Sequence, residues 1–102
     1  MKFDDFMNLT VGEGVVIRGI DATVTKITDT KAGEQMCFDG ITITAQKSMR
    51  RLEVSFVSSR TGKVDHLYPV LFVDFPDSVH NRVVLNSMSM WDPFNSSPGN
   101  SD

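Results

Sequence analysis

Hydrophobic and polar residues alternate along most of the chain between Gly14 and Val73, and this period of two is typical of half-buried β-strands. The clearest alternation lies in residues 51–59, where Leu52, Val54 and Phe56 are separated by polar residues. Successive side chains of a strand point to opposite faces, so these three residues are expected to face a core. The pattern predicts a mostly β domain.

Turn signals divide the alternating region into strands. Asp39-Gly40 separates the β-rich stretches 34–38 and 41–46, and Asp-Gly readily adopts the positive φ angles of a tight hairpin turn. Thr61-Gly62 turns strand 51–59 into the stretch 63–73. Pro69 has no N–H to give to a ladder, so it marks an edge, a bulge, or the end of one strand and the start of another.

The stretch from Val15 to Ile27 is too long for one straight strand of ordinary length, and Gly19 is expected to mark a bend or bulge within it. Residues 1–9 have apolar side chains at helical spacing, with acidic residues near the start that suit the helix dipole. A short N-terminal helix should therefore lay Phe3 and Phe6 over an open end of the sheet.

The C-terminal region is less defined by its pattern. Residues 79–88 fit either a short helix or an alternating strand, and both remain open. Residues 91–102 have the Pro, Gly, Ser and Asn content of a flexible tail. We therefore expect one domain over residues 1–90, a small barrel of five to six strands with a short N-terminal helix. Its core is expected to depend on Val24, Phe38, Ile43, Val54 and Phe56.

The order of glycines and apolar residues from Gly12 to Ile27, followed by Cys37-Phe38-Asp39-Gly40, resembles SH3-like small β-barrels of the KOW and Tudor type. The resemblance covers about residues 12 to 58 and implies a strongly bent five-stranded barrel. Such barrels bind peptides, proteins or nucleic acid, usually without chemistry. The stretch 63–73 is longer than these barrels need, and no set of aromatic residues matches a ligand cage, so no ligand residues are carried over.

Composition and charge narrow the function classes. With 102 residues and a hydrophobic content of 40%, the chain suits one domain without a large ligand cavity. The net charge is −3, but residues 47–63 carry +4 and the remainder −7. No apolar run approaches the length needed to cross a bilayer and no signal-peptide core is present, so we expect a cytoplasmic protein without a membrane partner.

Residues that could carry chemistry lack the spacing that chemistry requires. Gly12-Glu13-Gly14 is not followed by the last glycine of a dinucleotide fingerprint, and no Gly-Lys-Ser/Thr is present to hold phosphates. Cys37, His66 and His80 do not have the spacing of a zinc site or of a nucleophile and its base. We therefore expect no enzyme, no cofactor and no metal.

Five residues are the candidate partner-binding residues: Lys47, Arg50, Arg51, Trp91 and Phe94. The three bases, in an expected loop, could meet an acidic protein surface or clamp phosphates. Large apolar side chains are unusual in a tail, so each of the two aromatics should pack back on the barrel or anchor in a partner pocket, and Phe94 is the better docking candidate.

Three functions remain for such a domain. The first is a protein-binding accessory or adaptor module, which is favoured because the basic residues fall into two small clusters, Lys47 to Arg51 and Arg60 to Lys63. The second is a nucleic-acid-binding barrel that uses Lys47, Arg50 and Arg51, although the negative net charge opposes it. The third is a structural subunit that forms homo-oligomers by pairing an exposed strand edge.

Overall fold

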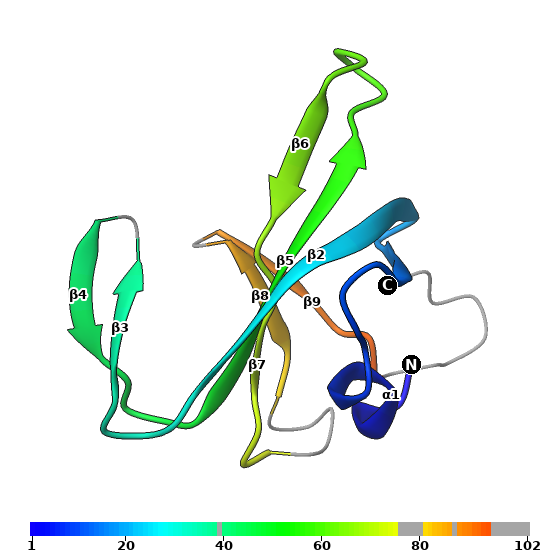
Figure 1. Ribbon diagram of the computed structural model, residues 1–102. Coiled ribbons are helices and arrows are strands. Elements are labelled where there is room, and N and C mark those ends of the chain that lie inside the picture. The colour runs from blue at the N-terminus through cyan, green and yellow to red at the C-terminus, as the bar shows by residue number, and fades with distance from the viewer. Residues whose placement is uncertain (39, 76–80, 87, 95–102) are drawn as a thin grey trace.

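The computed structural model describes residues 1–38, 40–75, 81–86 and 88–94, which form one short helix and nine strands (Figure 1). Seven of these strands form one sheet that curls into a half barrel, and the other two form a separate hairpin. The elements are α1 (Phe3–Met7), β1 (Gly14–Ile17), β2 (Ile20–Thr30), β3 (Gln35–Phe38), β4 (Ile41–Thr44), β5 (Met49–Val57), β6 (Val64–Leu67), β7 (Val70–Phe72), β8 (Val83–Asn86) and β9 (Ser89–Trp91). The predicted mainly β architecture and N-terminal helix are confirmed, but there are nine strand segments instead of five to six.

Strand β5 is paired along both of its edges. One edge pairs with β2, from Thr23 opposite Ser55 to Thr30 opposite Met49. The other edge pairs first with β6 and then with β7, both antiparallel to β5 and in the same register. Pro69 separates β6 from β7, and its carbonyl oxygen still accepts a hydrogen bond from Leu52 N–H (2.8 Å). Of the three alternatives left open for Pro69, the structure shows the end of one strand and the start of another, and the interruption adds to the strand count.

The expected bend at Gly19 is a complete hairpin turn. Strands β1 and β2 run antiparallel, with Ile17 opposite Ile20, and Arg18 and Gly19 have φ angles of 51° and 80°. Two positive φ angles are characteristic of the tight turns that suit the right-handed twist of a hairpin. The chain reverses here because glycine adopts this conformation without steric cost, while Arg18 tolerates it.

The bulge lies farther along, at Thr25 of β2, where the pairing with β5 shifts by one residue. The Thr25 hydroxyl donates to the carbonyl oxygen of Glu53 and lies 2.9 Å from its carboxylate. An extra residue on one strand reverses which side chains face the core. Beyond the bulge, Ile27 packs against the core and Lys26 and Thr28 are exposed.

The core lies on the concave side of the curled sheet and is covered by α1. Phe6 of the helix packs with Val24, Leu52 and Val54, and the cluster continues through Leu71, Val83, Leu85 and Trp91. Two of the residues predicted for this core, Val24 and Val54, are buried, and Phe56 is partly buried. Ile43 was predicted wrongly, because β3 and β4 form their own two-stranded sheet and leave it 46% exposed. Phe38 was also predicted for the core, but its side chain is not among those that the structure describes.

The C-terminal part of the described chain adds two strands. Val83–Asn86 is the strand β8, which decides between helix and strand for these residues, while 76–80 and 87 lie outside the described residues. Trp91 ends β9 and is 3% exposed. The domain therefore does not end at residue 90 as predicted, because the large indole is buried in the core. Residues 95–102 of the predicted tail lie outside the described ranges.

We predict that Leu52→Ala lowers the free energy of unfolding by about 2–5 kcal/mol, since it removes buried methyl groups from the centre of the core. Ile43→Ala removes a similar side chain from an exposed strand and should cost less than about 1 kcal/mol. Urea unfolding followed by circular dichroism measures both values. Equal losses for the two variants would show that the β3–β4 hairpin belongs to the core after all.

Candidate functional site

The outer face of the sheet, opposite the core, carries polar side chains from β2 and β5. Arg51 lies opposite Thr28, and Glu53 lies opposite Lys26. The bulge at Thr25 brings Lys26 and Thr28 to this face, and the alternation of β5 does the same for Arg51 and Glu53. The β3–β4 hairpin stands beside this face and converts part of it into a groove.

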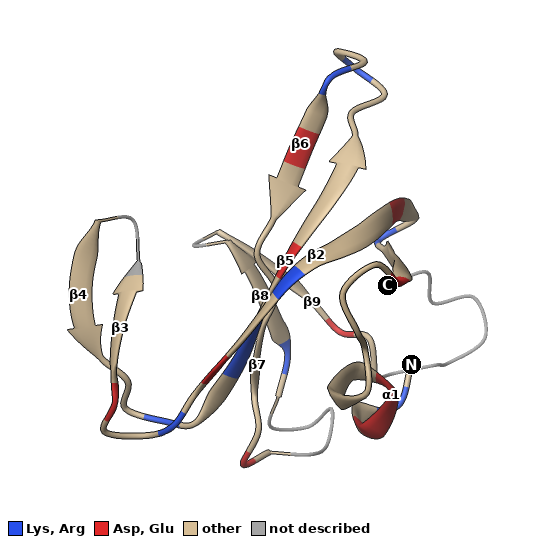
Figure 2. Ribbon diagram, in the orientation of Figure 1, with Lys and Arg blue, Asp and Glu red and all other residues tan. Residues whose placement is uncertain are grey.

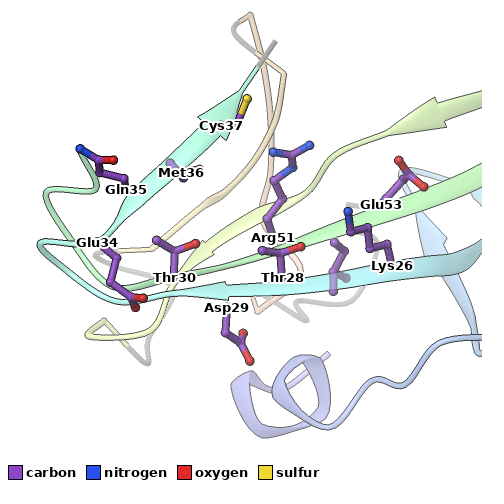
Figure 3. Close-up of a pocket in the computed structure, with 11 residues that line it drawn as sticks. Lys26, Thr28, Asp29, Thr30, Glu34, Gln35, Met36, Cys37, Arg51 and Glu53 are labelled. Carbon is purple, nitrogen blue, oxygen red and sulfur yellow. The ribbon is translucent and has the colours of Figure 1, made fainter. Parts of the chain in front are cut away.

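A polar hollow of about 350 Å³ separates β3 from the outer face of β2 and β5 (Figure 3). In Figure 3 the Arg51 side chain rises from the sheet on the side where β3 lies, whereas the Asp29 carboxylate points to the other side, toward α1. The lining combines bases, acids, hydroxyls and one exposed thiol: Lys26, Thr28, Asp29, Thr30, Glu34, Gln35, Met36, Cys37, Arg51, Leu52 and Glu53.

A second, apolar hollow of about 330 Å³ lies between β4, β5 and β7. Its lining residues are Met36, Ile43, Thr44, Ala45, Gln46, Lys47, Met49 and Phe72. Met36 lines both hollows, and we call the two together the hairpin groove. The groove therefore presents an apolar compartment directly beside a charged one.

The base of the β3–β4 hairpin is fixed by backbone hydrogen bonds. Gly33 N–H donates to the carbonyl oxygen of Ala45 (2.8 Å), and Ala45 N–H donates to that of Glu34 (2.8 Å). The Glu34 carboxylate accepts a hydrogen bond from Lys31 N–H (2.8 Å), and the Ser48 hydroxyl accepts one from Ala32 N–H (3.1 Å). These bonds hold the hairpin beside the sheet, while its tip carries no such contacts among the described residues.

Two of the five predicted site residues lie in the hairpin groove. The Lys47 ammonium lies over the rings of Phe75 (4.8 Å) and Phe72 (5.8 Å), in cation–π contact at the apolar hollow. The Arg51 guanidinium lies 5.4 Å from the centre of the Tyr68 ring and lines the polar hollow. Both aromatic contacts hold a basic group at the edge of the groove.

Arg50 lies on the opposite face, so the expected basic loop is wrong. Residues 49–57 are a strand, and its alternation separates Arg50 from Arg51. Arg50 forms a bidentate ion pair with Asp29, with Nε to Oδ1 at 2.7 Å and Nη2 to Oδ2 at 2.9 Å. Its Nη1 also donates to the carbonyl oxygen of Met7, the last residue of α1. Arg50 thus fastens the helix to the sheet.

The ion pair shifts the titration of both partners. The hydrogen bond from Arg50 lowers the pKa of Asp29, with a further contribution from its positive charge, against a smaller rise due to burial. The same hydrogen bond raises the pKa of Arg50. The Asp29 side chain is 60% exposed, so the contribution to stability is that of a partly screened surface pair.

The two aromatic candidates pack within the fold. Trp91 belongs to the core cluster, and the half-buried ring of Phe94 lies 6.1 Å from that of Phe3 in α1. Of the two outcomes expected for these aromatics, packing onto the barrel is the one observed. Phe94 therefore helps to cover the core, and the hypothesis that it docks into a partner loses its best support.

The basic residues do not form a continuous track on the described surface. Figure 2 shows them at separate places, with Arg60 and Lys63 at the tip of the β5–β6 hairpin. No group of three or more described His, Cys, Asp or Glu side chains is arranged to hold a metal ion. No helix within the described ranges is long and apolar enough to span a bilayer.

Sequence reasoning missed most of the groove. Cys37 was set aside because its spacing to the histidines fits no site, but its side chain is exposed at the polar hollow. Ile43 was assigned to the core, and Met36, Lys26 and Phe72 were not singled out. The sequence feature that could have indicated the groove is the hairpin between Gly33 and Gln46, whose apolar face has no obvious partner strand. This feature does not indicate on which side of the sheet the hairpin lies.

We predict that Asp29→Asn lowers stability at neutral pH by up to about 1 kcal/mol. Because the folded pKa of Asp29 lies below its usual value of 3.8, its contribution is present above that value and disappears as the pH falls through the folded pKa. The difference between the variant and the parent chain should therefore vanish in acid. Thermal unfolding across pH 2 to 7, with Asp21→Asn as the control in the same strand, tests this; an undiminished difference at the lowest pH would contradict it.

Comparison of the chain with known proteins finds no matching protein family, no similar curated protein and no similar solved structure.

Proposed function

We propose that the protein is a non-enzymatic binding module, an accessory or adaptor protein that holds a segment of a partner protein in the hairpin groove. The observation that carries this proposal is the open apolar hollow of Met36, Ile43, Met49 and Phe72 beside a charged hollow. Open apolar surface next to a few polar groups is typical of sites that anchor one apolar side chain and orient it.

The charges around the groove favour an acidic partner segment. Asp29 is paired with Arg50, and Glu34 and Glu53, which accept hydrogen bonds from Lys31 N–H and the Thr25 hydroxyl, keep their negative charge, so the groove sets three bases against two carboxylates. Lys26 and Lys47, by contrast, have no described carboxylate within 4.0 Å. A partner that brings an apolar residue followed by a carboxylate would match both hollows.

A protein partner is better supported than nucleic acid. Lys26 and Arg51 line the polar hollow together with the acids Glu34 and Glu53, Lys47 lies at the apolar hollow, and Arg50 is paired with Asp29 on the other face. Phosphate-binding surfaces gather bases along a continuous path. The curled sheet is consistent with a small β-barrel, the architecture from which this proposal starts.

The proposal predicts that a photo-crosslinking residue at Ile43 in the intact chain captures a defined partner segment, whereas the same residue at Val16 on β1 does not. A synthetic peptide of the captured sequence should bind the protein in calorimetry. Peptides that crosslink equally from both positions, or a captured peptide with no measurable affinity, would overturn the proposal.

The same peptide tests the two basic residues of the groove. We expect Lys47→Glu and Arg51→Glu each to weaken its binding about fivefold to tenfold, because each reverses an attraction to acidic residues. Arg82→Glu, an equal charge change at an exposed site outside the groove lining, should leave affinity unchanged. Arg50 is left intact because its substitution would loosen α1. Equal effects of all three variants would mean that only net charge matters.

A further inference from the structure

The β5–β6 hairpin extends beyond the rest of the sheet as a two-stranded arm (Figure 1). Its cross-strand pair Val57 and Val64 is 65% and 64% exposed, although both residues are apolar. Two-stranded hairpins are marginal in water without further packing. The arm therefore presents apolar surface and a strand edge that this chain alone leaves uncovered within the described residues.

The hydrogen-bond pattern shows which backbone groups of β6 face outward. Ser58 N–H donates to the Lys63 carbonyl oxygen (2.9 Å), which extends the ladder one residue beyond β6. Hydrogen-bonded pairs alternate along an antiparallel ladder, so Asp65 directs its backbone toward β5, and Val64 and His66 direct theirs away. His66 N–H donates to the Asp65 carboxylate (2.8 Å), consistent with a group that has no strand partner.

The neighbouring strand does not reach this edge. Strand β8 pairs with β7 through Val84 opposite Val70, and in this register the last residue of β8, Asn86, falls opposite Tyr68. Val64 and His66 lie beyond it. No described strand therefore covers the outward-facing edge at residues 64–66, and an exposed edge of this kind is a template for pairing with another strand.

We propose that β6 pairs antiparallel with β6 of a second copy of this chain, with Val64 opposite Val64 across a twofold axis. The backbone N–H and C=O groups of the two Val64 residues then exchange hydrogen bonds. In this register Lys63 of each copy lies opposite Asp65 of the other. The edge is thus complementary in charge to itself.

Two requirements favour the register centred on Val64 over those centred on nearby residues: opposed side chains must lie on the same face, and opposed charges must differ in sign. A twofold axis perpendicular to the sheet must relate a residue to its own copy, because successive side chains point to opposite faces. Centring the pair on Asp65 would place two carboxylates side by side, which is unfavourable. Centring the pair on His66 would place Lys63 opposite Pro69, so Lys63 would have no carboxylate opposite it. Of the three registers, only the one centred on Val64 places both Lys63 and Asp65 opposite a residue of the other charge.

The two faces of the resulting four-stranded sheet would differ in polarity, one apolar and the other charged. Val57 lies opposite Val64 in each arm, so one face would carry a row of four valines that are now exposed. The other face would carry the two Lys63–Asp65 pairs. Lys63 has no carboxylate within 4.0 Å among the described residues of its own chain. This interface leaves the hairpin groove open and does not depend on the proposed function.

Sedimentation equilibrium of the intact chain tests the proposal. The edge is short, so we expect a weak dimer whose average mass rises from 11.4 kDa toward twice that value as the concentration approaches about 1 mM. Lys63→Asp and Asp65→Lys should each weaken dimerisation at least about tenfold, because each places like charges opposite one another. Lys31→Asp, at another turn, should leave it unchanged.

Mixing the two single variants is the decisive experiment. The Lys63→Asp chain carries two acids and the Asp65→Lys chain two bases, so the mixture should form a heterodimer more tightly than either variant dimerises alone. Val64→Pro removes an N–H that β5 does not use and should abolish dimerisation without loss of β-structure in circular dichroism. A parent chain that stays monomeric at about 1 mM, a mixture that associates no more than its components, or a Val64→Pro chain that still dimerises would overturn the proposal.

Discussion

The two-sided pairing of β5 is the constraint on which the rest of the structure depends. Every residue of β5 is paired with a residue of β2 or of the β6–β7 segment, and most are paired with a residue on each side. Because side chains alternate along a strand, β5 also sends Leu52 and Val54 into the core and Arg51 and Glu53 to the hairpin groove. The core and the candidate site therefore cannot shift independently.

Polar residues make the connections that the strands do not. Arg50 joins the end of α1 to β2 through Asp29, and the helix in turn covers the core with Phe6. Asn81 is fully buried, and its side-chain amide donates to the carbonyl oxygens of Phe72 and Phe75. Buried polar groups are costly unless they are hydrogen-bonded, so such residues fix one arrangement of the segments around them. They hold Phe72, and with it the apolar hollow, in place.

The elements that the sequence predicts well are those governed by local chemistry. The alternation at Leu52 and Val54, the hairpin between residues 38 and 41 and the interruption at Pro69 all follow from side-chain period and turn preference. The errors concern tertiary placement. Ile43 has the same alternation as Val54, yet its hairpin pairs with no strand of the main sheet. Arg50 and Arg51 are adjacent in sequence, but the strand carries them to opposite faces, and Trp91 is buried despite its tail-like surroundings.

Amide hydrogen exchange of the intact chain, measured residue by residue, tests most directly whether β5 supports the fold. The amides of β5 should exchange slowest, with Leu52, which donates to Pro69, protected almost to the limit set by global unfolding. The amides of the β3–β4 hairpin, a two-stranded sheet with one open groove, should exchange much faster at the same pH. Hairpin amides protected as strongly as those of β5, or β5 amides that exchange early, would contradict the central position of this strand.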